Sequence, residues 1–300
     1  MRLREIKQIL EENVNFLRAE YKEINGKYEI LAFQEIYKAI RNLENLGFLK
    51  EDIEYLESMD TIFHDKSQRV IVDGTGLTTF ATKIDIINLK VVAVINAIKE
   101  ALPEQDQNSI SIKLPMYTEL KEVSIFMKEI DMILNQTFIN EYKSSIKLQN
   151  FDSGSNWIEI ILENKEAIIF MGGLVNSAIN FLKSSYLSWK QTSHTIKMLE
   201  TEDNARQLIL KALEENIKMQ AQSHASALMK DFNIDESHQE YHTNLSHSIQ
   251  KLAELLSKGT EVHTALNAPE ETKQAFPDVE KTLTLIENAT KLLTNGNSEE

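Results

Sequence analysis

The absence of glycine and proline between Gly173 and Gly259 is the feature that most constrains how this chain folds. Both residue types commonly end or interrupt helices, so a stretch of this length without them predicts helix almost throughout. A single break is expected at Thr201-Glu202-Asp203, where Thr201 is a suitable N-cap for a new helix. We therefore predict a long helical region over residues 165–268.

Apolar residues in this region recur in two narrow stripes with the alternating spacing of coiled coils. The stripes comprise Leu210, Leu213, Ile217, His224 and Leu228, followed by His238, His242, Leu245, Ile249, Leu252 and Leu256. Such stripes usually meet another helix, which belongs either to the same chain or to a second copy. We therefore predict a coiled-coil-like helical array, and we call the aliphatic members of the two stripes the predicted seam.

Residues 1–60 predict a helical hairpin. Apolar residues from Ile6 to Ile24 recur every three or four positions, as on one face of a helix. Gly26 interrupts this pattern, and a second stripe runs from Phe33 to Leu46, just before Gly47, a suitable C-terminal cap. A winged-helix DNA-binding unit would use residues 33–48 for recognition and 62–72 as the wing. The glutamates on the would-be recognition helix disfavour it.

Residues 61–164 predict a small central sheet with helices on one face, in the order β-α-β-α-β-β. The segments are residues 68–73, 77–102, 109–114, 118–134, 145–151 and 156–162, with a hairpin turn over Asp152–Ser155 before the last strand. Residues 269–300 add a helix from Pro277, with Val279, Leu283, Ile286 and Leu293 on one side, and a disordered tail. The expected fold class is α+β and predominantly helical.

Charge and composition exclude several classes of protein. The formal net charge is −14 and only six basic residues are arginine, so nucleic acid is an unfavourable partner. The chain has no cysteine, which excludes disulfides and thiolate metal sites and fits a cytoplasmic location. The charged N-terminus has no apolar signal core. The abundance of Ile, Lys and Asn is typical of an AT-rich bacterial or phage genome.

The sequence Asp73-Gly74-Thr75-Gly76 lies between a predicted strand and a predicted helix, where phosphate-binding loops occur. It makes Gly74, Thr75 and Gly76 weak candidates for nucleotide binding. The third glycine of a dinucleotide-binding motif is missing, and no Gly-Lys-Ser/Thr sequence is present. A strand-to-helix turn needs the same residues for conformational reasons, so an ordinary turn is the favoured interpretation.

His238 and His242 are the weak metal-ligand candidates, because histidines four residues apart share a helix face. Gln239 follows the first histidine, where the metalloprotease motif has glutamate. Packing of both histidines along the apolar stripe is the favoured interpretation, and we expect neither a metal nor a cofactor.

A charge-free apolar run begins at Ala167 and, with its flanks, gives a possible membrane segment over residues 167–189. Its apolar positions include Ile168, Phe170, Leu174, Ile179, Phe181 and Trp189. The uncharged part is shorter than the roughly 20 residues that span a bilayer. Its glycines suit close packing in a protein core equally well. Membrane association is therefore open but not favoured.

The first functional hypothesis is a non-enzymatic assembly or interaction protein that acts through helix packing, as a homo-oligomer or with a protein partner. Such a protein would suit an accessory or effector role in a bacterial or phage multi-protein system of the defence type. The alternative is a membrane-acting effector that uses residues 167–189. A second alternative is a nucleotide- or metal-dependent enzyme, although the sequence contains no strong catalytic motif.

Overall fold

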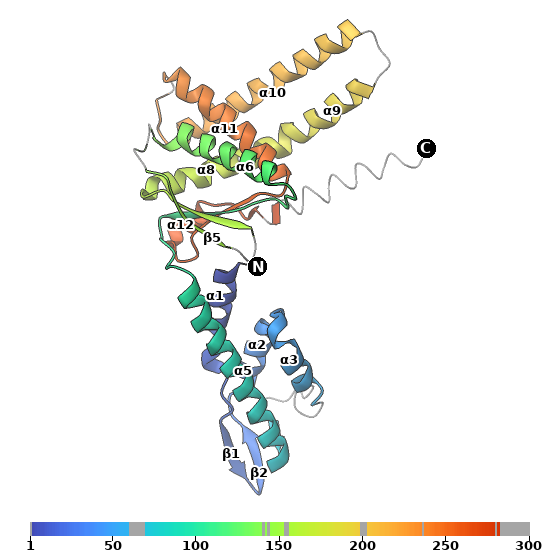
Figure 1. Cartoon of the computed structure of the whole chain (residues 1–300), viewed down its shortest axis with the longest axis vertical. Coiled ribbons are helices and arrows are strands. Elements are labelled where there is room, and N and C mark those ends of the chain that lie inside the picture. Colours follow the sequence, from blue (N-terminus) through green and yellow to red (C-terminus); the bar gives the residue numbers. More distant parts are fainter. Residues whose placement is uncertain are drawn as a thin grey trace. The chain divides into compact units, whose positions relative to one another are not determined.

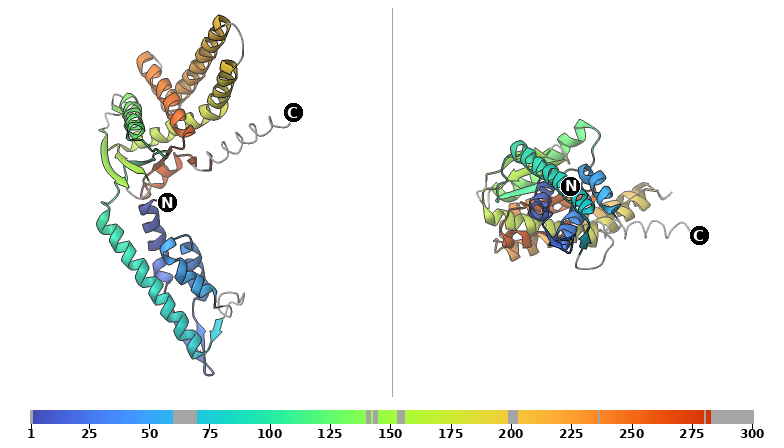
Figure 2. Two further views of the ribbon diagram at one scale, coloured as in Figure 1. Left: turned by 45° about the vertical axis from the view of Figure 1, so that its right-hand side comes forward. Right: turned by 90° about the horizontal axis from the view of Figure 1, so that it is seen from below.

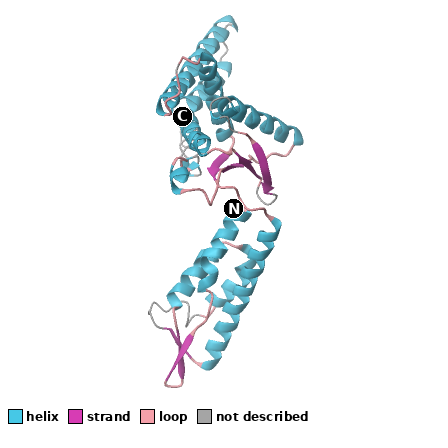
Figure 3. Cartoon of the chain, turned by 90° about the vertical axis from the view of Figure 1, so that its left-hand side faces the viewer, coloured by secondary structure: helices cyan, strands magenta, loops and turns pink. Residues whose placement is uncertain are grey.

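The computed structural model shows a mostly helical α+β chain, which confirms the predicted fold class (Figure 1). It describes residues 2–59, 70–139, 142, 145–152, 156–198, 203–235, 237–279 and 281–282. The chain divides into two compact units, residues 1–104 and 105–300. The boundaries predicted from the sequence near residues 60, 164 and 268 stay a prediction. Each unit has its own small antiparallel sheet (Figure 3).

The N-terminal unit combines helices with a three-stranded sheet of order β1-β2-β3. Its elements are α1 (Leu3–Asn13), η1 (Val14–Phe16), β1 (Tyr21–Ile24), β2 (Lys27–Ile30), α2 (Phe33–Leu43), η2 (Gly47–Leu49), α3 (Lys50–Glu57), β3 (Val70–Val72) and α5 (Gly74–Ala101). The apolar stripe predicted from Phe33 to Leu46 is buried in the core of this unit. Of the hypothetical wing over residues 62–72, only β3 falls within the described residues.

The predicted helix through Ile24 is wrong in its second half. The chain leaves α1 at Asn13, and Tyr21 and Ile24 belong to strand β1. Asn25 and Gly26 join β1 to β2 with φ angles of 53° and 74°. An Asn-Gly pair adopts positive φ readily and favours the tight turn of a β-hairpin. The turn therefore overrides the helical spacing of the neighbouring apolar residues.

Asp52 links α3 to α5 in the N-terminal unit. Its two carboxylate oxygens accept hydrogen bonds from Lys83 Nζ at 3.4 Å and Lys90 Nζ at 2.5 Å. Burial raises the pKa of this carboxyl, but the bonds from Lys90 and Lys83 outweigh that effect and hold the pKa below its ordinary value. A buried aspartate is tolerated here because two cations pair with it.

The C-terminal unit packs helices on one face of a four-stranded sheet of order β5-β6-β4-β7. Its elements are β4 (Ser109–Lys113), α6 (Leu120–Leu134), η3 (Asn135–Ile139), β5 (Lys147–Asp152), β6 (Trp157–Ile161), α8 (Lys165–Phe181), η4 (Leu182–Tyr186), α9 (Leu187–Met198), α10 (Asp203–Asp231), α11 (Gln239–Ser257), β7 (Glu261–Thr264) and α12 (Glu270–Gln274). The predicted turn residues 153–155, helix break at residues 201–202 and tail after residue 282 lie outside the described residues.

The single central sheet predicted from sequence is a second correction. The strands and helices follow one another along the chain as expected, but β3 pairs with β2 in the N-terminal sheet. The fourth strand of the C-terminal sheet is β7, which lies inside the region predicted to be helical. Gly259, with φ of 95°, ends the helix before it, and Val262 and Thr264 then alternate inward as in a strand.

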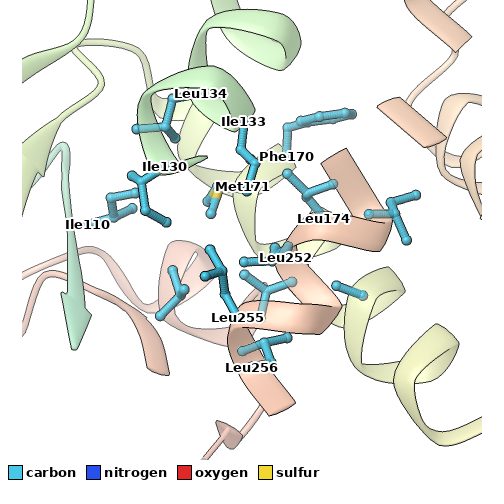
Figure 4. Close-up of a cluster of buried hydrophobic side chains, with 14 of the residues drawn as sticks. Ile110, Ile130, Ile133, Leu134, Phe170, Met171, Leu174, Leu252, Leu255 and Leu256 are labelled. Atoms are coloured by element: carbon cyan, nitrogen blue, oxygen red, sulfur yellow. The ribbon is translucent and has the colours of Figure 1, made fainter. Parts of the chain in front are cut away.

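Helices α6, α8 and α11 form the hydrophobic core with one face of this sheet (Figure 4). The labelled core residues are Ile110, Ile130, Ile133, Leu134, Phe170, Met171, Leu174, Leu252, Leu255 and Leu256. Two adjacent glycines allow neighbours to approach α8 closely. A Cβ atom at Gly172 would lie 2.5 Å from the carbonyl oxygen of Ala275, and one at Gly173 would lie 2.7 Å from the ring of Phe232. These glycines serve close helix packing inside the unit.

Candidate functional site

Helix α10 changes its surroundings halfway along its length. Its second half, residues 221–231, packs on α8 and α11 and buries Ala221, Ala225, Leu228 and Met229 in the core. A polar contact fixes it to α11, because His242 Nε2 lies 2.8 Å from Ser226 Oγ and 3.1 Å from the carbonyl oxygen of Gln222. This half of α10 is part of the rigid core.

The first half of α10 leaves the core together with α9 (Figures 1 and 2). We call α9 and residues 203–220 of α10 the arm. Its inner side holds Leu210, Leu213 and Ile217, which are only half-buried. The arm therefore has few core contacts and presents most of its surface to solvent.

A second line of apolar residues runs along the opposite side of the arm. Ala205, Leu208, Ala212 and Met219 are all exposed, and their spacing places them on one face of α10, with Glu215 between the last two. We call these four apolar residues the outer stripe. Leu208 is 70% exposed and Met219 60%, and the neighbouring Ile209 is 49% exposed. Single exposed aliphatic residues are common in proteins, but a line of them on a projecting helix indicates a contact surface.

A groove of about 600 Å³ opens at the base of the arm, between α10 and α11. Phe181, Tyr186 and Trp189 contribute its aromatic side. The π-helical turn η4 explains how Phe181 and Tyr186 come together, because such a turn brings residues five apart onto one face. The Phe181 and Tyr186 ring centroids are 6.3 Å apart, and those of Tyr186 and Trp189 are 5.6 Å apart.

The polar side of the groove carries both signs of charge. Lys251 Nζ lies 3.2 Å from Glu129 and 3.4 Å from Glu254, which ties α11 to α6. Burial, followed by the Glu254 carboxylate, raises the pKa of Tyr186 above its ordinary value. In the part of the chain that the structure describes, Trp189 Nε1 is a buried donor with no acceptor.

The arm, counted together with the residues that connect its two helices, has no net charge although the whole chain is strongly acidic. Residues 187–220 contain five basic and five acidic side chains, whereas the complete chain carries a formal charge of −14. Long-range repulsion between copies of the chain is therefore weakest at the arm.

The predicted seam falls into two groups. One group is buried in the core of the C-terminal unit, so it packs against helices of the same chain. It comprises Leu228, Leu245, Ile249, Leu252 and Leu256. Leu210, Leu213 and Ile217 lie on the inner side of the arm and are half-buried. Coiled-coil geometry between these helices remains a prediction.

The loop at Gly74, Thr75 and Gly76 is the N-terminus of α5. The Asp73 carboxylate accepts a hydrogen bond from the Gly76 amide at 2.7 Å, so the chain supplies its own anion there. A Cβ atom at Gly76 would lie 3.3 Å from Val72 Cβ, which accounts for the second glycine through close packing.

The two histidines proposed as metal ligands have different environments. His242 is held by α10, as described above, whereas His238 is exposed at the N-cap position of α11. Within the described ranges, no three His, Asp or Glu side chains gather closely enough to hold a metal ion.

The possible membrane segment is mostly a core element. Ile168, Phe170, Leu174, Ile179 and Phe181 are buried, and Trp189 lines the groove. Among the described helices, Lys165–Trp189 is the one candidate membrane span, with a mean hydropathy of 1.3 and 61% of its most apolar window buried inside the chain. Such burial is consistent with the core helix of a soluble protein.

The outer stripe is the functional feature that sequence reasoning missed. The three- and four-residue spacing of the outer stripe can be read from the sequence. The inner stripe of α10 has the same spacing and larger residues, so it dominates the pattern. A helix with apolar residues on two sides normally needs two partners. Among the described residues, the outer side of α10 is exposed and only the inner side is partly covered.

Comparison with known proteins identifies a bacterial relative. The chain is 31% identical over 294 residues, or 94% of each chain, to "Uncharacterized protein YqaP" of Bacillus subtilis (strain 168). No family model and no solved structure matches the chain.

Proposed function

We propose that this chain, which belongs to the same family as Bacillus subtilis YqaP, is a non-enzymatic assembly protein whose arm packs against the arm of a second copy. The exposed outer stripe of α10 is the observation that carries the proposal. Leu208, Ile209 and Met219 occupy the part of the helix that leaves the core, where a second chain has access to them.

The energy available from this surface favours a reversible contact. Complete burial of one Leu, Ile or Met side chain contributes about 1.5–3 kcal/mol. A dimer would bury Leu208, Ile209 and Met219 from each copy. Association is opposed by roughly 4–15 kcal/mol of lost translational, rotational and side-chain freedom. The two quantities are comparable, so we expect a dimer that dissociates on dilution.

The charge distribution supports a second copy as the partner. Two chains of charge −14 repel each other most strongly through their acidic regions. Residues 187–220 have no net charge, so contact there brings together a part of each chain that adds little to the repulsion. Raising the salt concentration screens the remaining repulsion and should strengthen the contact.

Sedimentation velocity over a range of concentrations tests the proposal. The unmodified chain is expected to shift from 34.4 kDa toward twice that mass as concentration rises. Leu208→Glu places a charge in the outer stripe and should keep the chain monomeric. Leu89→Glu is the matched control, because Leu89 is also 70% exposed on a helix but lies in the N-terminal unit. A monomer at every concentration, or equal assembly by L208E and the unmodified chain, would refute the proposal.

A further inference from the structure

We infer that the two arms meet antiparallel, across a two-fold axis that passes beside Ala212. This inference rests on the proposed function and specifies which residues of the outer stripe face one another. It follows from the positions of small, large and charged residues along α10.

The order of small and large residues in the outer stripe suits an antiparallel contact. Ala205 and Met219 each lie seven residues from Ala212, on opposite sides of it and on the same helix face. An antiparallel arrangement about Ala212 places Ala205 of each copy opposite Met219 of the other. Large residues then face small ones, which allows the two surfaces to interdigitate. A parallel arrangement in register would set Met219 against Met219 and leave a gap between the two Ala205 side chains.

The residue at the centre permits close approach of the helices. Ala212 is exposed and has no side chain beyond Cβ, so two α10 helices can cross there without steric conflict. Larger residues at this position would hold the helices apart and reduce the contact made by Leu208. The small central residue therefore fits a crossing point.

Charges beside the stripe favour the same direction. Lys211 lies at one edge of the outer stripe, before Ala212, and Glu215 lies in the stripe toward the same edge, after Ala212. An antiparallel two-fold brings this edge of one copy against the same edge of the other, so that Lys211 of each copy lies beside Glu215 of its partner copy. Both side chains are exposed. A parallel two-fold would instead bring opposite edges of the two stripes together, which separates Lys211 from Glu215 of the partner copy.

Engineered cysteines test this geometry cleanly because the natural chain has none. Ala212→Cys gives a protein with a single thiol, which the two-fold axis would place next to its symmetry mate. Disulfide formation requires Cα atoms roughly 4.4–6.8 Å apart, so it reports a specific approach. Under mild oxidation, we expect most of A212C to migrate at twice 34.4 kDa.

A mixing experiment determines the direction of the two helices. Ala205→Cys alone and Met219→Cys alone should stay uncross-linked, whereas a mixture of A205C and M219C should form the covalent dimer. Leu89→Cys controls for random collision between exposed thiols. Far-UV circular dichroism of each variant establishes that it folds, and all the substituted positions are exposed.

The outcomes separate this inference from the proposed function. A chain that sediments as a monomer at all concentrations overturns both. Two results would overturn the antiparallel geometry while the chain still forms a reversible dimer. In the first, A205C or M219C cross-links to itself. In the second, neither A212C nor the mixture cross-links. Cross-linking by A212C and by the mixture, but by neither A205C nor M219C alone, supports the inference.

Discussion

The two halves of α10 have similar apolar spacing and opposite surroundings. In residues 221–231 the apolar side chains are enclosed by α8 and α11, whereas in residues 203–220 they are half-buried or exposed. The helix is continuous across this boundary. Helical periodicity thus identifies a surface that needs a partner, but the tertiary structure decides whether that partner lies within the chain.

This contrast assigns different roles to residues of the same type. Leu228 and Leu208 are both leucines on α10, yet the first is buried and the second is 70% exposed. Residues 221–231, the closed half of α10, should determine the stability of the C-terminal unit. Residues 203–220, the open half, should determine how copies of the chain associate. The following experiments test that separation.

The largest expected effect is a loss of unfolding free energy when Leu228, but not Leu208, is truncated. Leu228→Ala leaves a cavity in the core and should lower the free energy of unfolding by about 2–5 kcal/mol. Leu208→Ala, measured at a dilution where the chain is monomeric, should change it by less than about 0.5 kcal/mol. Urea unfolding of the two variants gives the comparison. Equal losses of unfolding free energy in the two variants would show that Leu208 contributes as much to the folded core as Leu228 does.

A smaller effect is expected from the polar contact that fixes the closed half. His242→Ala removes the hydrogen bond to Ser226 Oγ and the contact with the Gln222 carbonyl oxygen. A typical loss is about 1 kcal/mol of unfolding free energy. His238→Ala is the matched control, since His238 is exposed and should tolerate the change. If the control destabilises the chain as much as H242A, this contact does not fix α10 to α11.

The smallest effect concerns pH at the junction of the two halves. Burial lowers the pKa of His224, whose ring packs edge-on to Phe181 with centroids 5.9 Å apart. The unfolded chain therefore binds this proton more readily, and stability falls as pH decreases through about 6.5 toward the folded pKa. Above that range this histidine makes no pH-dependent contribution. His224→Gln cannot titrate.

Urea midpoints at pH 7.5 and pH 5.5 measure this contribution. The unmodified chain should lose more stability on acidification than H224Q does. An identical loss in both proteins would mean that His224 is not the responsible group and that the junction is insensitive to its charge.

Sequence patterns predicted those elements whose partners lie in the core. The stripe from Phe33 to Leu46 and the seam from Leu245 to Leu256 are buried as expected, because a narrow apolar stripe must pack on something. The hairpin at Asn25-Gly26 was missed, since the turn outweighed a helical spacing. Strand β7 was missed because four residues after Gly259 give too short a pattern to separate from the preceding helix.

The candidate site was harder to predict for a different reason. Phe181 and Tyr186 come together through a π-helical turn, which the spacing of an α-helix does not predict. The outer stripe was concealed by the larger residues of the inner stripe, which share its period. The sequence alone therefore predicts that α10 packs against another helix. The structure shows that, among the described residues, the outer stripe is the exposed face.

Hydrogen–deuterium exchange at low and high protein concentration measures association through the arm separately from stability of the core. Backbone amides of residues 203–220 are expected to exchange more slowly at high concentration, while those of residues 221–231 exchange equally slowly at both. Unchanged exchange in residues 203–220 on concentration would contradict association through the arm, as would concentration-dependent protection confined to any other part of the chain.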